Sequence, residues 1–375
     1  MSLAALIIVD EDKAGADLSV FGMPLVEYQA RLAQASAANH IVVVTAQVPA
    51  SLVAALDRLR GRGLNVVLAR TAIEAAGQVH PDETVLLFEP GCLPQQAVVD
   101  RLAQAGKCAI VTVPFNPELR HQELIDAEHG WAGIACINGA LVRQAAELPG
   151  DWSLASALLR FAVQAGAERI ALGDTADLQV HHLTSGAEAA AATQAIVGGV
   201  TLLDTGFSGS VALPASAFLA RQLARFALPP VAIDAVSLLL LTFVIGLGLA
   251  GWTATALLCF IPAGIVALVA QRLDMAALAA SPVPAFLRKV LPWAGRFLLV
   301  MAGSRMVSDG EGWGALVLSA WLIWELLLAG KPEDRFNADE GSATLLTGMG
   351  LAVGFPLIGL GLALAHSLAD NIRKG

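Results

Sequence analysis

One stretch of this chain, between Asp234 and Arg272, contains no charged residue at all. An uncharged run of that length is too long for a core helix of a small soluble domain. It fits two membrane-spanning helices of about 20 residues each, separated at Gly251–Thr253. We therefore predict that the chain crosses a membrane twice within Val231–Gln271.

The rest of the C-terminal part continues this pattern. Apolar segments at Gly312–Gly330 and Leu345–Leu368 predict further spans. With five spans Arg373 and Lys374 would lie outside, against the preference of basic residues for the cytoplasmic side. Either a sixth span lies within Ser281–Met306, or the last segment is re-entrant, so we expect five or six spans in all.

The last apolar segment also carries a packing signal. Gly350 and Gly354 have the spacing G-x-x-x-G, which permits two helices to approach closely. The chain is rich in glycine, with 35 of these residues, so the spacing on its own is a weak indication. We expect a homodimer through the membrane domain as the assembly.

The part before Val231 is acidic. Nine Lys/Arg and ten Asp/Glu follow from that residue onward, so the first 230 residues carry −8 of the net charge of −9. Nucleic-acid binding needs a basic face, so we expect no nucleic-acid partner.

The dipeptide His181-His182 has no carboxylate or cysteine near it in sequence, which disfavours zinc. No CxxC spacing is present, which favours reduced thiols in a cytosolic compartment at Cys92, Cys108, Cys136 and Cys259.

Short apolar stretches alternate with segments of helical periodicity along this first part. The stretches that predict strands are Ala4–Val9, His40–Thr45, Asn65–Ala69, Thr84–Phe88 and Cys108–Val113. Because each is apolar throughout, we predict a parallel sheet with helices on both faces, an α/β domain of Rossmann-like type. Such sheets bind ligands at the carboxyl ends of their strands, here Asp10–Lys13, Thr45–Gln47, Arg70 and Glu89–Gly91.

An amphipathic segment joins the two parts. Leu213–Phe226 carries Arg221 and Arg225 one helical turn apart, and we expect it to lie on the cytoplasmic membrane surface. The predicted division is a soluble domain at residues 1–212, a linker helix at 213–230 and a membrane domain at 231–375. The expected location is the inner (cytoplasmic) membrane, as a multi-pass protein with the N-terminal domain and the polar loop Lys331–Gly341 in the cytoplasm.

Motifs in both parts resemble known transferases. SVFGMPLVEYQARLAQASAANHIVVVT (Ser19–Thr45) is similar to the segment after the Gly-rich loop of sugar-phosphate nucleotidyltransferases, and WAGIACINGALV (Trp131–Val142) to a later segment of that fold. ARFALPPVAIDAVSLLLL (Ala224–Leu241) resembles the entry into the membrane domain of CDP-alcohol phosphotransferases. The layout resembles the bifunctional inositol-1-phosphate cytidylyltransferase/CDP-alcohol (CDP-inositol) phosphotransferase family. This resemblance implies a nucleotidyltransferase-like α/β domain followed by an all-α polytopic membrane domain.

In the first domain the resemblance implies a nucleotide site at Asp10, Lys13 and Glu89. The family's Gly-rich loop holds the triphosphate with backbone amides. Here Asp10, Glu11 and Asp12 occupy that turn, and only Lys13 opposes them. Glu89 stands where the family has a metal-binding Asp, with Mg²⁺ as the cofactor of an active enzyme. The alternative for Glu89 is a solvated acid at the end of a strand.

In the membrane domain the family's transfer reaction needs four carboxylates at helical spacing, which hold divalent metal. Asp274 matches one of them and is the candidate catalytic residue. The next segment contains only basic charges. Arg288 and Arg296 lie about two helical turns apart and predict a site for the phosphate of a lipid headgroup. The alternative is that both anchor the protein on the cytoplasmic side.

These departures predict a divergent, catalytically impaired relative of the fusion enzymes. It would act as a lipid-binding or scaffold subunit in the synthesis of phospholipids or polar headgroups, with membrane lipids as its partners. The alternative is an active bifunctional enzyme that makes a CDP-polyol from CTP and a polyol phosphate. That enzyme would use CTP and a CDP-alcohol, with Mg²⁺, and would transfer the phospho-polyol to a lipid alcohol.

Overall fold

The computed structural model divides the chain into two compact units, Met1–Gly199 and Val200–Gly375, which are described separately below. The structure describes residues 2–9, 18–105, 108–115, 123–148, 153–172, 179–200, 207–224, 226, 230–279, 281–308, 313–328 and 340–374.

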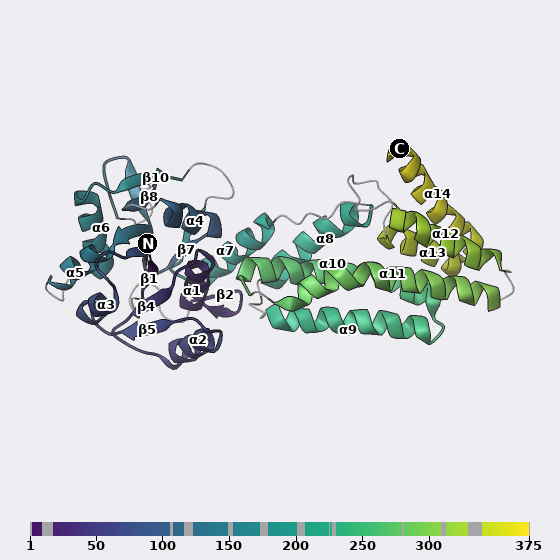
Figure 1. Ribbon diagram of the computed structural model, residues 1–375, viewed down its shortest axis with the longest axis horizontal. Coiled ribbons are helices and arrows are strands. Elements are labelled where there is room, and N and C mark those ends of the chain that lie inside the picture. The colour runs from purple at the N-terminus through teal and green to yellow at the C-terminus, as the bar shows by residue number, and fades with distance from the viewer. Residues whose placement is uncertain are drawn as a thin grey trace. The chain divides into compact units, whose positions relative to one another are not determined.

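A seven-stranded sheet forms the centre of the first unit (Figure 1), in the order β10-β8-β9-β6-β1-β4-β5. Its strands are β1 (Leu3–Ile8), β4 (His40–Val44), β5 (Val66–Ala69), β6 (Thr84–Phe88), β8 (Ala109–Pro114), β9 (His129–Asn138) and β10 (Glu168–Ala171). The five predicted strands are confirmed, and β1 pairs in parallel with β4 and β6. The sheet is not wholly parallel as predicted, because β9 runs antiparallel to both β6 and β8.

Helices cover both faces of this sheet, as its apolar strands predict. They are α1 (Leu25–Ala35), α2 (Ala50–Gly61), α3 (Ala72–Gln78), α4 (Gln96–Gln104), α5 (Gly139–Ala146), α6 (Leu154–Gln164) and α7 (Gly186–Gly199). Alternate residues of β1, Ala4 and Leu6, share a core with α3, α5 and α6. Helix α1 contacts α2 and α4, and Figure 1 shows these three on the other side of the sheet.

Two short antiparallel ribbons complete the first unit. Strands β2 (Ser19–Val20) and β3 (Met23–Pro24) form a hairpin, and β7 (Cys92–Pro94) pairs with β11 (Val180–His182). The second ribbon brings a distant segment to the carboxyl end of β6, because His182 lies opposite Cys92.

The second unit is a helical bundle. Its helices are α8 (Phe207–Ala224), α9 (Pro230–Leu249), α10 (Thr253–Ala277), α11 (Pro282–Ser308), α12 (Gly314–Leu328), α13 (Glu340–Val353) and α14 (Pro356–Lys374). Helix α8 corresponds to the predicted amphipathic helix and packs against α10. Val231–Leu249 and Thr253–Ala277 are long and apolar enough to cross a membrane, with mean hydropathies of 2.3 and 2.2. The predicted break at Gly251–Thr253 is confirmed.

The C-terminal hairpin corrects one prediction. Leu345–Leu368 is not one span but two helices, α13 and α14, because the chain turns at Gly354, whose φ is +84°. Of the two glycines in the predicted G-x-x-x-G spacing, Gly350 lies at a close helix approach and Gly354 lies at the turn. The close approach is between Gly350 and Gly359, where a Cβ on Gly350 would lie 2.6 Å from the Cα of Gly359.

The bundle distributes its side chains differently from the sheet unit. Among the described residues, all but three of the exposed large hydrophobic side chains belong to the bundle, the exceptions being Val53, Ile73 and Leu124. Several polar side chains are instead buried inside it, among them Ser216, Asp234, Arg272 and Ser319. A surface of this kind suits an apolar solvent better than water.

Candidate functional site

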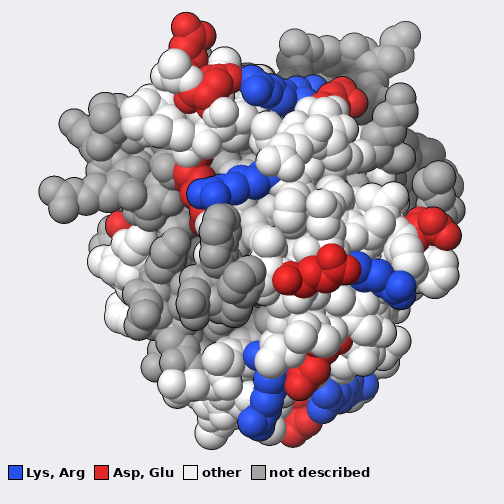
Figure 2. Space-filling view, turned by 90° about the vertical axis from the view of Figure 1, so that its left-hand side faces the viewer, with Lys and Arg blue, Asp and Glu red and all other residues white. Residues whose placement is uncertain are grey.

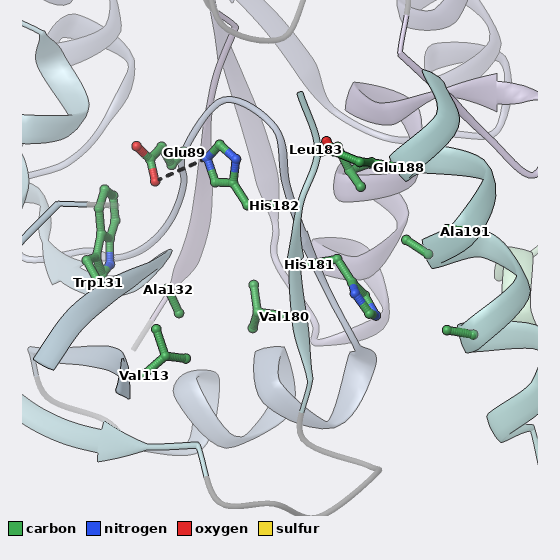
Figure 3. Close-up of a pocket in the computed structure, with 12 residues that line it drawn as sticks. Glu89, Val113, Trp131, Ala132, Val180, His181, His182, Leu183, Glu188 and Ala191 are labelled. Carbon is green, nitrogen blue, oxygen red and sulfur yellow. Dashed lines mark ion pairs between the residues drawn. The ribbon is translucent and has the colours of Figure 1, made fainter. Parts of the chain in front are cut away.

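A pocket of about 530 Å³ lies at the carboxyl edge of the sheet (Figure 3). Strand β6 contributes Glu89 just beyond its end, β8 and β9 contribute apolar side chains, and β11 and α7 close the other side. The lining is Glu89, Val113, Trp131, Ala132, Val180, His181, His182, Leu183, Glu188, Ala191, Ala192 and Ala195.

Glu89 is held in the pocket wall by its neighbours. It is 5% exposed, and its backbone N–H donates to the carbonyl of Gly133 over 2.8 Å. Gly133 has φ +85°, and a Cβ there would lie 2.9 Å from Oε2 of Glu89 and 3.2 Å from Cβ of Cys92. Only glycine fits this close approach without strain. Burial, and then the charge of Glu89, raise the pKa of Cys92, so its thiol stays neutral and is no nucleophile.

The two histidines of β11 point in opposite directions, as neighbours on a strand do. Figure 3 shows His182 turned toward Glu89, with Nε2 3.9 Å from Oε2, and His181 turned toward α7. Nε2 of His181 is buried and has no hydrogen-bond partner among the described residues. Burial lowers the pKa of His181, so this imidazole is neutral at pH 7.

The chemistry of this pocket is apolar and acidic. Its lining combines Trp131 and small aliphatic side chains with two carboxylates and two imidazoles, and it contains no lysine or arginine from the described residues. A triphosphate needs cations or many backbone donors around it. The described walls therefore suit a neutral or cationic group better than a polyphosphate. Nor do the described residues anywhere include three or more His, Cys, Asp or Glu side chains grouped to hold a metal ion.

Of the three predicted nucleotide-binding residues, the structure describes Glu89. Asp10 and Lys13 lie outside the described residues. Glu89 lines the pocket. Two residues at other predicted strand ends make local hydrogen bonds. The hydroxyl of Thr45 donates to the carbonyl of Gln47 over 2.7 Å, and the backbone N–H of Arg70 donates to the carboxylate of Glu74 over 2.7 Å. Both contacts shape local turns and lie away from the pocket lining.

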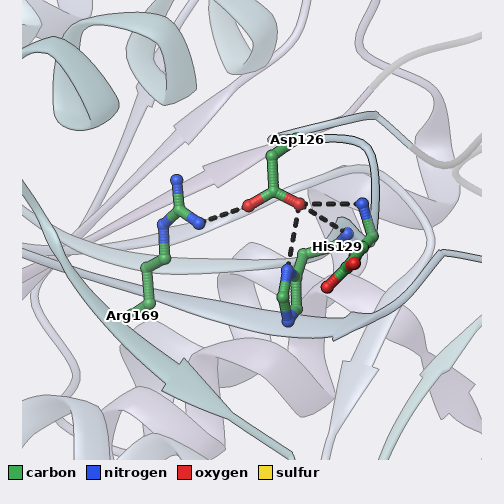
Figure 4. A network of polar contacts seen from close by, with 4 residues as sticks. Asp126, His129 and Arg169 are labelled. Atoms are coloured by element: carbon green, nitrogen blue, oxygen red, sulfur yellow. Dashed lines mark hydrogen bonds and ion pairs between the residues drawn. The ribbon is translucent and has the colours of Figure 1, made fainter.

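A second polar network lies at the start of β9 (Figure 4). Oδ1 of Asp126 accepts hydrogen bonds from the backbone N–H groups of Glu128 and His129, at 2.9 and 2.8 Å, and lies 2.9 Å from Nδ1 of His129. Its Oδ2 pairs with Arg169 on β10. These contacts, the Glu128 amide first, hold the pKa of Asp126 well below its ordinary value. The network ties a loop to the sheet edge and is structural.

The charged surface near this sheet carries both signs. Figure 2 shows lysine and arginine side chains interspersed with aspartate and glutamate on the face in view. Interspersed charges give a weaker field than a patch of one sign.

In the bundle, the predicted site residues are Asp274, Arg288 and Arg296. Oδ1 of Asp274 accepts the backbone N–H of Ser281 at 2.9 Å. Arg288 is exposed, whereas Arg296 is half-buried with its guanidinium 4.9 Å from the ring centre of Trp293. A cavity shared by Asp274 and the two arginines remains a prediction.

Sequence reasoning missed two features that the fold assembles. His182 meets Glu89 across the β7–β11 ribbon, although the two residues are far apart in sequence. Asp234 is 3% exposed, and its Oδ2 accepts the hydroxyl of Ser281 at 2.6 Å, so one serine joins Asp234 and Asp274. The sequence signal that could have pointed to Asp234 is its position at the N-terminal end of the uncharged run.

The comparisons with known proteins concern the sheet unit. No family model and no curated protein matches the chain. Three solved structures with low similarity to the chain are nucleotidyltransferases. These include an inositol-1-phosphate CTP transferase from T. maritima (14% identity, TM-score 0.35, covering 49% of this chain and 90% of that chain). Another is a 4-diphosphocytidyl-2C-methyl-D-erythritol synthase from Anaerococcus prevotii (14%, 0.37, 51% and 94%). A third, from Bacillus anthracis, is assigned as a glucose-1-phosphate thymidylyltransferase (8%, 0.42, 54% and 97%).

Proposed function

We propose that this protein is a membrane-embedded relative of the nucleotidyltransferase/CDP-alcohol phosphotransferase fusions that binds lipid headgroups and performs neither transfer. One observation carries the proposal. The pocket at the carboxyl edge of the sheet presents Glu89 and Glu188 and, among the described residues, neither lysine nor arginine, so a triphosphate bound there would meet like charges. Like charges at about 4 Å cost on the order of 4 kcal/mol at an effective dielectric of about 20.

The side-chain distribution of the bundle supports the membrane part of the proposal. Large apolar side chains such as Phe243, Trp313 and Trp321 face outward, and Ser319 and Thr347 are buried. Two of its helices are long enough to span a bilayer. We place the bundle in the inner membrane as a multi-pass domain, with the sheet domain in the cytoplasm.

The carboxylates of the bundle support the loss of transfer chemistry. The resemblance calls for four acids around a metal, and the described residues bring together Asp234 and Asp274, both engaged by Ser281. Two carboxylates that share one serine do not fit the oxygen-rich shell of a magnesium site.

In this proposal the basic residues of α11 bind the lipid headgroup. Arg288 is exposed and Arg296 lies over Trp293, and guanidinium groups bind phosphate oxygens through paired hydrogen bonds. Native mass spectrometry of the full-length protein tests this. We expect anionic phospholipid to remain bound to the wild type and fewer lipid molecules to remain bound to an Arg288→Ala/Arg296→Ala variant. Arg143→Ala, on an exposed position of α5, is the control for a lost charge.

The runner-up function is an active cytidylyltransferase with CTP and Mg²⁺. Glu89 favours it, because this carboxylate lies at the end of β6, beside β1, and lines the pocket with His182. Calorimetry of the full-length protein with CTP and Mg²⁺ separates the two functions. Our proposal expects no micromolar binding. Micromolar binding that Glu89→Gln abolishes would establish the runner-up instead.

A further inference from the structure

Arg272 is a buried arginine near the end of an apolar helix. It lies on α10 and is 6% exposed. Its Nε donates to Oγ of Ser216 over 3.1 Å, and its Nη1 donates to the backbone carbonyl of Val200. Ser216 is itself fully buried and donates its hydroxyl to the carbonyl of Leu213 over 2.8 Å. Neutral acceptors therefore hold the guanidinium in one orientation.

These contacts position the charge without neutralising it. Within the described part of the chain, no carboxylate forms an ion pair with Arg272. Asp274 follows two positions later, which on a helix is nearly the opposite side. It is engaged by the backbone N–H of Ser281, and Asp234 by the hydroxyl of that serine. The nearby acids are therefore directed toward Ser281, and Arg272 toward α8.

A second arginine increases the positive charge. Arg221 lies in the last turn of α8, the helix that packs on α10 and that carries Ser216. Arg221 is exposed and can be reached from the surface of the bundle, whereas Arg272 is buried. A buried charge beside a like charge is costly unless an anion joins them. Ionisable residues in such apolar settings commonly mark a functional site.

The free donors of the guanidinium indicate which anion fits. Arginine carries five N–H donors, and the two contacts above leave about three on Arg272. Guanidinium groups bind phosphate oxygens through paired hydrogen bonds. We infer that Arg272 and Arg221 form a phosphate-binding site, with Ser216 as a positioning residue. The inference rests on the proposed headgroup binding and adds a site separate from Arg288 and Arg296. Its ligand is a phosphate group, carried by a lipid or free in solution.

Thermal unfolding of the full-length protein in detergent tests this site. The probes are phosphatidic acid, inorganic phosphate and the zwitterionic lipid phosphatidylcholine. We expect phosphatidic acid to raise Tm more than phosphatidylcholine does. Arg221→Gln should weaken the apparent affinity about tenfold, as the loss of a charged hydrogen bond does. Arg272→Gln should abolish the shift, and Ser216→Ala should reduce it. Arg221→Gln keeps the test valid if the buried variant fails to fold.

The three probes and the variants together distinguish the possible outcomes. A Tm shift with inorganic phosphate as well identifies the phosphate group as sufficient, and a shift with phosphatidic acid alone identifies a lipid ligand. A shift that survives both Arg221→Gln and Arg272→Gln but is lost in Arg288→Ala/Arg296→Ala overturns this inference and leaves the proposed function standing. No shift in the wild type, together with no lipid retained in native mass spectrometry, overturns both.

Discussion

At the scale of single residues, Glu89 keeps its place through a glycine on the neighbouring strand. Gly133 combines φ +85° with a Cβ position 2.9 Å from Oε2 of Glu89. Gly63 has a similar φ of +83° but open space around it. We expect Gly63→Ala to cost about 1 kcal/mol for its backbone conformation. Gly133→Ala should cost about 1 to 3 kcal/mol more, because its methyl group overpacks the pocket wall. Urea unfolding measures both, and equal losses would show that the close approach to Glu89 is unimportant.

Asp126 predicts a pH dependence. Its pKa in the folded protein lies below the ordinary 3.8, so its carboxylate contributes stability above that value and loses it as pH falls through the folded pKa. We expect Asp126→Asn to lower Tm at pH 7, and the difference from wild type to narrow below about pH 4. Asp57→Asn, at a side chain that is 67% exposed, is the matched control. A difference that stayed constant down to pH 2 would contradict this assignment.

At the scale of elements, the α13–α14 hairpin depends on the contact between Gly350 and Gly359. A Cβ on Gly350 would meet backbone atoms at 2.6 and 2.8 Å, which cannot move as a side chain can. Gly350→Ala should therefore destabilise the bundle by on the order of 1 to 3 kcal/mol. Gly361→Ala, with nothing within 4 Å, should be neutral or stabilising. Thermal unfolding in detergent compares the two variants. Similar Tm values would show that the contact between Gly350 and Gly359 does not stabilise the bundle.

The elements also show what sequence can predict. Continuous apolar stretches identify five strands correctly, because burial on both faces leaves a pattern in each strand. The direction of β9 leaves no such pattern, since it depends on the path of the chain between strands. The turn at Gly354 interrupts a segment that is apolar on both sides, so hydropathy alone joins α13 and α14. The contacts of His182 with Glu89, and of Arg272 with Ser216, join residues far apart in sequence and need the fold itself.

At the scale of the whole molecule, the proposed topology predicts which side each surface faces. Trp252, between α9 and α10, is 66% exposed, and the account places it opposite the cytoplasm. Trp252→Cys in a variant without native cysteines should react with a membrane-impermeant maleimide only from outside. Asp57→Cys, on α2, should react only from the cytoplasm. Labelling of Trp252→Cys from the cytoplasm would show that α9 and α10 have the opposite orientation or do not cross the membrane.

The proposed function is lipid binding without transfer of a phospho-alcohol. The most direct measurement incubates the full-length protein in lipid vesicles with Mg²⁺, a labelled CDP-alcohol and a lipid alcohol acceptor. Asp234 and Asp274 are both hydrogen-bonded to Ser281. We therefore expect release of labelled product no faster than from vesicles without protein. Product formed by the wild type and abolished by Asp274→Asn would contradict the account and establish an active phosphotransferase.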